Sequence, residues 1–356
     1  MKKKKDKIIV AMSGGVDSSV VLGLLAKRYE NLLGIFLYFW EDKDGEENKS
    51  SSSKSLIDAR AIAKKFQITL YTLNFKEKFK NQIVNYFLEE YQKGGTPNPC
   101  VKCNKFIKLG ALIERAKDLG YDYVATGHYA RVVQNDGKYK LLRGVDATKD
   151  QSYFLYTLNQ EQLSHLLFPL GGYRKDDVRK KAEKMNLMVS RKSDSQEICF
   201  ITTKSHNDFL KKNLDLKEGD IFDMNNKKIG RHRGLPLYTI GQRKGIELGG
   251  DGPYYVAKFD YKKNILFVTN IPDDKVMYGD QFYLKDFNWI SGKEEKMPFN
   301  SEVVIRYHHK GIKCLLSKKS GRYYVKLETP ARAITPGQSA VFYNGEEVIG
   351  GGIITI

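Results

Sequence analysis

The sequence predicts an α/β protein with a doubly wound parallel sheet, followed by a small, mostly β middle domain and a C-terminal β barrel. Strand-like apolar runs alternate with helical patterns up to about residue 205, as is typical of parallel sheets. Short apolar runs and Gly-rich turns then follow between residues 218 and 259. From Gln281 onward short strand-like runs dominate, as in small antiparallel barrels. We therefore expect domains at residues 1–205, 206–278 and 279–356.

The α/β domain is expected to begin with a buried strand at residues 8–12 and an amphipathic helix at 20–29. The elements expected next are a strand at 32–40, a polar loop at 41–55, a helix at 56–66, a strand at 68–73 and a helix at 75–92. The segment Thr96-Pro97-Asn98-Pro99 ends that helix, because each proline removes a donor and fixes φ. A helix at 106–119 and a strand at 121–125 follow.

The turn between the first strand and helix has the sequence Ser13-Gly14-Gly15-Val16-Asp17-Ser18-Ser19. Its glycines permit a tight turn and close approach of a ligand, and the helix N-terminus beside it favours an anion. The serines add hydroxyl donors, and Asp17 suits capping or binding of a metal ion that neutralises phosphates. No Gly-x-x-x-x-Gly-Lys-Ser/Thr motif occurs in the chain. The turn therefore predicts a phosphate cradle of another type, at a crevice where the strand ends 12–19, 37–40 and 126–128 meet.

Composition restricts the partners of the chain. Sixty Lys and Arg against 42 Asp and Glu leave a net charge of +18, which favours a large polyanionic partner over a mere lysine-rich bias. The excess is spread along the chain, so it locates no binding face. No apolar run approaches the ~18 residues that span a bilayer, and no signal-peptide core follows the first lysines. We expect a cytoplasmic protein without a membrane partner.

Four cysteines are too few for a disulfide scaffold and indicate metal or redox chemistry. Cys100 and Cys103 form a Cys-x-x-Cys in the turn before the helix at 106–119, where the helix N-terminus, Lys102 and Lys105 would stabilise a thiolate. The motif alone is compatible with two of the four ligands of a zinc site, with a redox-active cysteine pair or with two ligands of an iron–sulfur cluster. A four-cysteine zinc site would need Cys314, which falls in the distant β domain and argues against it.

The glycine-rich turn resembles the pyrophosphate loop of the N-type ATP pyrophosphatases, whose adenine nucleotide alpha hydrolase-like domain cuts ATP between its α and β phosphates. Over nearly the whole chain the sequence is similar to the tRNA-specific 2-thiouridylases. The motifs that carry the similarity are residues 11–19, Thr96-Pro97-Asn98-Pro99, Cys103-Asn104-Lys105, residues 125–131, residues 149–154, Ser195-Gln196-Glu197-Ile198-Cys199-Phe200, residues 234–236 with 239–243, and Thr335-Pro336-Gly337-Gln338.

The resemblance implies ATP-dependent 2-thiolation of the wobble uridine in the anticodon arm of tRNA, with Mg²⁺ near Asp17. Uridine O2 would be adenylated, and sulfur would then displace AMP. The residues implied for ATP are Ala11, Met12, Ser13, Gly14, Gly15, Val16, Asp17, Ser18, Leu37 and Gly127. Those implied for the flipped base are Asn98, Pro99 and Cys100. Those implied for tRNA are His128, Lys149, Asp150, Gln151, Arg306, Tyr307 and Gln338.

The resemblance also makes Cys199 the acceptor of persulfide sulfur from a donor or relay protein. Cys103 would attack that persulfide and release hydrosulfide, or would act on the activated base through a disulfide with Cys199. One position departs from the family, where most members have Asp-x-x-Cys and this chain has Cys100-x-x-Cys103. The carboxylate role therefore cannot be carried over. Cys100, Cys103 and Cys199 would instead suit a [4Fe–4S] cluster held by three irons, with the fourth iron open to hydrosulfide. The persulfide–disulfide route and the cluster route both remain open.

Two other functions fit part of the sequence. A ligase that adenylates a small metabolite would explain the glycine-rich turn but not the three cysteines, the positive charge or the barrel. A non-catalytic RNA-binding protein with a decayed nucleotide site would explain the charge. The intact Ser-Gly-Gly-x-Asp-Ser motif and the presence of Cys103 and Cys199 argue against it.

Overall fold

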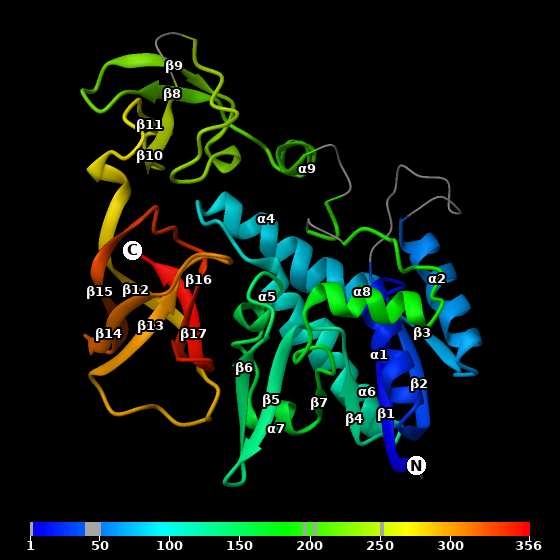
Figure 1. Ribbon diagram of the computed structural model, residues 1–356. Helices are drawn as coiled ribbons and strands as arrows, with labels where there is room; N and C mark the ends of the chain where they lie inside the picture. Colours follow the sequence, from blue (N-terminus) through cyan, green and yellow to red (C-terminus); the bar gives the residue numbers. More distant parts are fainter. Residues whose placement is uncertain (1–2, 40–50, 195–197, 202–204, 250–252) are drawn as a thin grey trace.

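A computed structural model describes residues 3–39, 51–194, 198–201, 205–249 and 253–356. Figure 1 shows an α/β domain on the right, a small sheet of green and yellow strands at the top and a barrel of orange and red strands on the left. The domain classes expected from the sequence are present. In the described residues no helix is long and apolar enough to cross a membrane.

The α/β domain contains a five-stranded sheet in the order β3-β2-β1-β4-β7, with every pair parallel. Its strands are β1 (Lys4–Met12), β2 (Tyr29–Tyr38), β3 (Leu70–Asn74), β4 (Tyr123–Ala125) and β7 (Leu166–Leu167). The central position of β1 follows from its apolar residues, because Ile8, Ile9 and Val10 are all fully buried. The carboxyl ends of β2, β1 and β4 consequently lie side by side.

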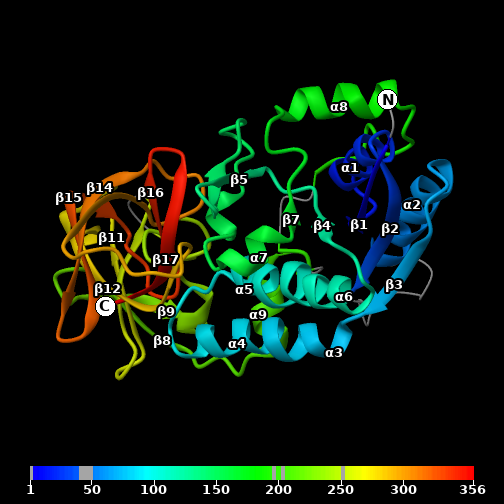
Figure 2. The same ribbon diagram turned by 90° about the horizontal axis from the view of Figure 1, so that it is seen from below.

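Helices cover both faces of this sheet (Figure 2). On one face α1 (Val16–Ala26) contacts α2 (Ser51–Lys65) and α8 (Lys175–Lys184). On the other face lies α6 (Leu112–Asp118). Successive residues of β1 serve different cores, since Val10 packs with Val20 of α1 whereas Ile9 packs with Leu112 of α6.

Two helical runs contain π-helical turns. The first consists of α3 (Lys76–Phe79), η1 (Lys80–Val84) and α4 (Asn85–Gln92). The second consists of α5 (Pro99–Cys103), η2 (Asn104–Ala111) and α6. The start expected at residue 106 was therefore wrong by seven residues. The helix begins at Pro99, because extended Asn98 at the N-cap is followed by a proline whose φ suits the first helical position.

Other element boundaries also differ from expectation. Helix α1 begins at Val16, directly after the glycine turn, and the chain enters β2 at Tyr29, where the sequence pattern predicted helix. Helix α2 begins at Ser51, inside the expected polar loop. Trp40 and residues 41–50 of that loop lie outside the described residues.

The middle sheet has the order β10-β11-β8-β9 and follows α9 (His206–Asn213). Its strands are β8 (Gly219–Phe222), β9 (Lys228–His232), β10 (Tyr255–Asp260) and β11 (Ile265–Thr269). Pairing of β12 with β17 closes the C-terminal sheet into an antiparallel barrel. The barrel strands are β12 (Tyr278–Trp289), β13 (Phe299–Val304), β14 (Ile312–Lys319), β15 (Arg322–Arg332), β16 (Ser339–Asn344) and β17 (Glu347–Thr355).

A hairpin from the α/β domain joins the barrel sheet. Strands β5 (Ala130–Asn135) and β6 (Lys138–Arg143) pair with each other, and Leu142 of β6 pairs with Glu347 of β17. Between β6 and β7, helix α7 (Gln160–Ser164) returns the chain to the parallel sheet. The hairpin therefore connects the strand ends of the parallel sheet with the barrel wall.

Candidate active site

The glycine-rich turn lies between β1 and α1, with Gly15 as the N-cap of the helix. Gly14 has a φ of +70°, and a Cβ on it would lie 2.1 Å from the carbonyl oxygen of Ser55. Only glycine fits there, because both the backbone conformation and the space exclude a side chain. Exposed Ser13 and half-buried Gly15 face the crevice at the strand ends.

The three serines proposed as phosphate donors are used inside the turn. Ser18 and Ser19 are buried, and their hydroxyls donate to the carbonyl oxygen of Gly15 at 3.2 and 2.8 Å. The backbone N–H of Ser13 donates to the hydroxyl oxygen of Ser18 at 3.2 Å. The Ser13 hydroxyl donates to that of Ser18 at 3.1 Å, so these bonds hold the turn in shape and leave its backbone N–H groups as the donors for an anion.

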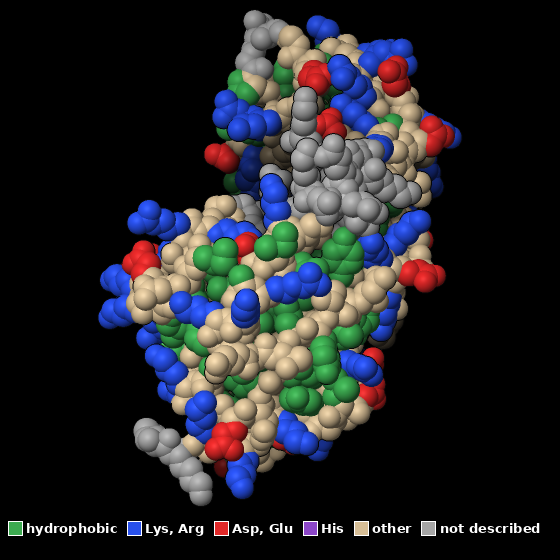
Figure 3. Space-filling model, turned by 90° about the vertical axis from the view of Figure 1, so that its right-hand side faces the viewer, with side chains coloured by type: hydrophobic (Ala, Val, Ile, Leu, Met, Phe, Trp, Pro, Cys, Tyr) green, Lys and Arg blue, Asp and Glu red, His purple; other side chains and the backbone are tan. Residues whose placement is uncertain are grey.

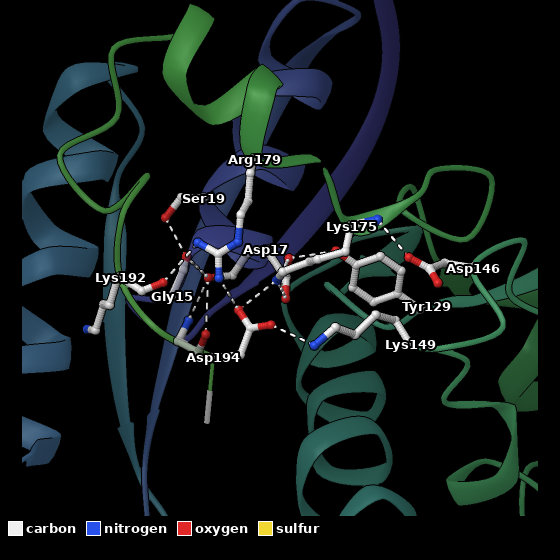
Figure 4. A network of polar contacts seen from close by, with 12 residues as sticks. Gly15, Asp17, Ser19, Tyr129, Asp146, Lys149, Lys175, Arg179, Lys192 and Asp194 are labelled. Atoms are coloured by element: carbon white, nitrogen blue, oxygen red, sulfur yellow. Dashed lines mark hydrogen bonds and ion pairs between the residues drawn. The ribbon is translucent and has the colours of Figure 1, made fainter. Parts of the chain in front are cut away.

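Asp17 belongs to a network of charged side chains in which Lys175 is buried (Figure 4). The ammonium of Lys175 donates to both carboxylate oxygens of Asp17, at 2.7 and 2.8 Å, and the hydroxyl of Tyr129 donates to one of them at 2.8 Å. Lys175 also lies 2.9 Å from Asp194, which pairs with Lys149 and Arg179 at 2.8 Å each. The network joins α1, the β4–β5 connection, α8 and the segment before Cys199.

This arrangement does not suit Asp17 as a magnesium ligand, because both of its oxygens already accept hydrogen bonds from Lys175. Together the described residues form no cluster of three or more His, Cys, Asp or Glu side chains suited to a metal ion. Instead, Lys149, Lys175, Arg179 and Lys192 surround the turn with positive charge. These positively charged side chains are suited to bind phosphate oxygens.

The two residues expected beside the adenosine lie at the ends of strands next to β1. Leu37 is near the end of β2, and Gly127 follows β4. A Cβ on Gly127 would lie 3.0 Å from the Cβ of Asp17 and 3.2 Å from the backbone nitrogen of Ser18. The carboxyl ends of β1, β2 and β4 therefore meet beside the glycine-rich turn, as expected from parallel sheets.

Cys199 lies near Cys100 and Cys103, which precede it by almost a hundred residues in the sequence. Cys103 is buried, Cys100 is half-buried and Cys199 is exposed, and Cys103 interacts electrostatically with both other thiols. We call these three residues the cysteine centre. Cys314 is buried in β14 of the barrel, as expected, so it does not take part.

The electrostatics of the cysteine centre differ from the expectation. Cys100 and Cys103 lie within the first turn of α5 and not before a helix. Burial raises the pKa of Cys100 and of Cys103, that of Cys103 to about 12, and the charge of Lys108 opposes this. Lys102 and Lys105, which we expected to stabilise a thiolate, lie over the ring of Phe106. Lys108 was missed because it is one of many lysines, and nothing in the local pattern sets it apart.

Asn98, expected to contact the target base, is the N-cap of α5. It lines a narrow cavity between the α/β domain and the barrel, with Tyr86 and Lys102 on one side and Gly337 and Ser339 on the other. Pro99 is buried and Cys100 half-buried in the next turn. The three residues proposed for the base therefore form one continuous segment at the domain interface.

Four of the residues expected to contact tRNA lie in the loops after β4 and β6. His128 shares a 2.7 Å hydrogen bond with the hydroxyl of Thr126, and burial together with Lys108 lowers its pKa to about 3. Its imidazole is therefore neutral at physiological pH. Lys149 pairs with Asp194, buried Asp150 accepts from the backbone of Gly144 and Ser152, and Gln151 accepts from the backbone of Tyr129.

The other three lie on the barrel, where it meets the remaining domains. Arg306 donates to the carbonyls of Ile240 and Ala333, the ring of Tyr307 lies 4.4 Å from that of Phe154, and the Gln338 amide donates to the carbonyl of Thr96 at 2.7 Å. A cavity of about 240 Å³ brings Asp150 and Tyr307 together with Arg143, His308, His309 and Lys310. Basic side chains are otherwise scattered, as on the face in Figure 3.

Comparison with known proteins covers all three parts of the chain. The family described as "tRNA methyl transferase HUP domain" matches residues 6–203, "tRNA methyl transferase PRC-barrel domain" matches 207–270, and "Aminomethyltransferase beta-barrel domain" matches 279–354. A solved structure, the U34-tRNA thiolase NcsA from Methanococcus maripaludis with its [4Fe-4S] cluster, is 20% identical over 55% of this chain and 61% of that chain, with a TM-score of 0.36. That likeness is too weak to transfer residue roles.

Curated relatives match at higher identity and over the full length. The tRNA-specific 2-thiouridylase MnmA 2 of Caldanaerobacter subterraneus subsp. tengcongensis is 42% identical, over 99% of this chain and 98% of that protein. The tRNA-specific 2-thiouridylase MnmA of Klebsiella pneumoniae subsp. pneumoniae is 43% identical over the same shares. With this similarity over its full length, the chain belongs to the tRNA-specific 2-thiouridylase family.

Proposed function

We propose that this chain catalyses ATP-dependent 2-thiolation of the wobble uridine of tRNA, in the cytoplasm, where its tRNA substrate is. The observation that carries the proposal is the position of the cysteine centre directly beside the strand-end crevice. Lys108 acts electrostatically on all three thiols and on His128, which follows β4. A nucleotide in the crevice and a sulfur on the cysteine centre would therefore flank the same base.

The first step is adenylation. The glycine-rich turn, with Lys175 and Lys192 beside it, would hold the β and γ phosphates of ATP. Uridine O2 attacks the α phosphate, a bond to phosphorus forms, pyrophosphate leaves with the electrons of the broken P–O bond, and the N3 proton passes to water. Mg²⁺ would arrive with the ATP phosphates rather than on Asp17. Asn98 and its neighbours would orient the flipped base at the domain interface.

The second step replaces oxygen by sulfur. Hydrosulfide attacks C2, the C–S bond forms, and AMP leaves with the C–O electron pair. The proton of hydrosulfide ends on N3 of the product. In the persulfide route Cys103 attacks a persulfide on Cys199, releasing hydrosulfide and forming a Cys103–Cys199 disulfide. An external thiol must then return two electrons to that disulfide.

The cysteine centre also fits a [4Fe–4S] cluster. Its donors are all thiols, and Cys100 is a third sulfur where most of the family has a carboxylate. The thiols do not form a site for a single metal ion, but a cluster is held by thiols on separate irons. Such a cluster would carry hydrosulfide without a redox change. A sulfur donor protein or inorganic sulfide would supply the sulfur.

An anaerobic single-turnover assay tests the proposal. Protein of known iron content is mixed with unmodified tRNA, Mg·ATP and either sulfide or a persulfide donor, and the digested nucleosides are measured for 2-thiouridine. Product that follows iron content and is lost in Cys100→Ala assigns the cluster route. Product without iron, retained in Cys100→Ala and lost in Cys199→Ala, assigns the persulfide route. Cys314→Ala, in the barrel, is the matched control.

Two outcomes would overturn the proposal. If tRNA binds but no 2-thiouridine forms by either route, the chain is not a thiolase. If pyrophosphate is released with a small acid and without tRNA, the crevice belongs to a metabolite ligase. Release of pyrophosphate that depends on tRNA would exclude that ligase.

A further inference from the structure

Lys108 stands apart from the other lysines of the chain by its surroundings. Its side chain is half-buried on η2, and it is the cation that acts on the thiols of Cys100, Cys103 and Cys199. The neighbouring apolar core contains Ile107 and Phe200. A long, positively charged side chain enters this apolar region only at a cost in desolvation.

The π-helical turn is the reason why Lys108 faces the cysteine centre. In an α-helix of 3.6 residues per turn, Lys108 would lie about 140° around the axis from Cys103, five residues earlier. A π-helix bonds residue i to residue i+5 and returns the fifth residue to the same face. The segment Asn104–Ala111 is π-helical, so its geometry turns the ammonium back toward the thiols.

No acidic partner balances this charge among the residues that the structure describes. The groups that influence the pKa of Lys108, apart from its burial, are the three thiols of the cysteine centre. Its ammonium makes no ion pair with a described carboxylate, in contrast to Lys175, which contacts both Asp17 and Asp194. A partly desolvated cation without a counter-charge favours binding of a small anion.

We propose that Lys108 binds the anionic sulfur, holding hydrosulfide beside the cysteine centre until it attacks the activated base. This proposal rests on the thiolation function proposed above and adds a residue to it. The thiols offer soft, partly apolar surroundings, and Lys108 offers a positive charge that can bind a hydrosulfide ion. In this role Lys108 touches the reacting sulfur and is therefore a catalytic residue.

The test compares full-length Lys108→Met and Lys108→Arg proteins with the wild type at varied concentrations of inorganic sulfide. Methionine keeps the length and apolar stem but removes the charge, so the apparent KM for sulfide should rise about tenfold or more. Arginine should restore most of the affinity. Pyrophosphate release that depends on tRNA should stay unchanged in both, because adenylation precedes sulfur attack. Lys117→Met, on an exposed surface of α6, is the charge-matched control.

A second measurement does not depend on turnover. Crystals of the wild type and of Lys108→Met are soaked in sodium bromide, and anomalous scattering locates the bromide. A peak beside Lys108 that disappears in the methionine variant supports an anion site. No peak in the wild type, or an unchanged KM for sulfide in Lys108→Met, overturns it. Slower pyrophosphate release in Lys108→Met would show that the lysine serves a phosphate instead. A wild type that makes no 2-thiouridine would refute the underlying function.

Discussion

At the residue scale, the glycine-rich turn depends on positions where no side chain fits. Gly14 combines a positive φ with a backbone neighbour at its missing Cβ. Gly127 lies against Asp17 and Ser18, so it sets how closely β4 approaches the turn. From the sequence alone, we explained these glycines by the close approach of a ligand. The tertiary structure adds a second reason, because α2 and the loop after β4 both pack closely against this turn.

Gly14→Ala is expected to destabilise the protein by about 3 kcal/mol or more and to abolish ATP binding. The left-handed backbone costs about 1–2 kcal/mol for alanine, and its Cβ would meet the carbonyl oxygen of Ser55. Thermal unfolding and calorimetry with ATP measure both effects. Gly137→Ala is the matched control, because Gly137 also has a positive φ but has open space around it. If Gly14→Ala and Gly137→Ala lost the same amount of thermal stability, the contact with Ser55 would not explain the effect.

Asp194 is expected to link stability to acid pH. Burial alone would raise its pKa, but hydrogen bonds from Lys149 and Lys175 outweigh burial and hold the pKa below its usual value. A lowered folded-state pKa gives stability that is present above the unfolded pKa of about 3.9 and is lost as pH falls below it. Asp194→Asn should therefore cost about 1–3 kcal/mol at pH 7 and progressively less as the pH falls below about 3.9.

The measurement for Asp194 is the midpoint of thermal unfolding at pH 7 and at pH 3, for wild type and variant. Asp118→Asn serves as the control, because Asp118 lies in an exposed 3.8 Å pair with Arg115 and should change stability little. If the unfolding midpoints of Asp194→Asn and wild type differed by the same amount at both pH values, the charge of Asp194 would not contribute to stability.

At the scale of the elements, the helical run from Pro99 to Asp118 determines the cysteine centre. Its first turn carries Cys100 and Cys103, and its π-helical turn redirects Lys108. The sequence predicted a helix here but not its early start, and no periodicity distinguished the π-turn. A π-turn changes the face of every following residue, so an ideal α-helical projection fails after Cys103.

Gly110→Ala is expected to disrupt the π-turn while the rest of the protein still folds. A Cβ on Gly110 would lie 2.2 Å from the carbonyl oxygen of Lys105, five residues earlier, so the segment must relax toward α geometry. Lys108 would then turn away, and 2-thiouridine formation should fall by about tenfold or more. Gly172→Ala, where a Cβ meets open space, is the control. Unchanged activity with sulfide would show that the turn is not needed.

At the scale of the whole molecule, the barrel is tied to the segment that precedes the cysteine centre. The backbone N–H of Thr96 donates to the carbonyl of Pro336 at 2.8 Å, and the Gln338 amide donates to the carbonyl of Thr96 at 2.7 Å. Gln338, which the resemblance implies in tRNA binding, thus contacts Thr96, two residues before Asn98. We propose that docking of tRNA on the barrel positions Asn98 through these bonds.

Gln338→Ala is expected to reduce the rate of thiolation more than the affinity for tRNA. The variant removes one bond between the barrel and Thr96, whereas most of the affinity comes from many phosphate contacts. We expect a severalfold lower single-turnover rate with a nearly unchanged Kd, measured by filter binding. Gln281→Ala is the control, since Gln281 bonds to Tyr324 within the barrel wall. A larger effect on Kd than on rate would make Gln338 a tRNA contact.

The sequence by itself determined the fold classes, the nucleotide turn and the family, because local motifs and alternating apolar patterns carry that information. It also singled out Cys103 and Cys199 through the resemblance. Only the tertiary structure brought Cys199 to Cys103, paired Asp17 with Lys175 and placed Lys108 beside three thiols. These contacts join segments far apart in the chain or depend on a π-turn. Their formation depends on packing, which no short stretch of sequence encodes.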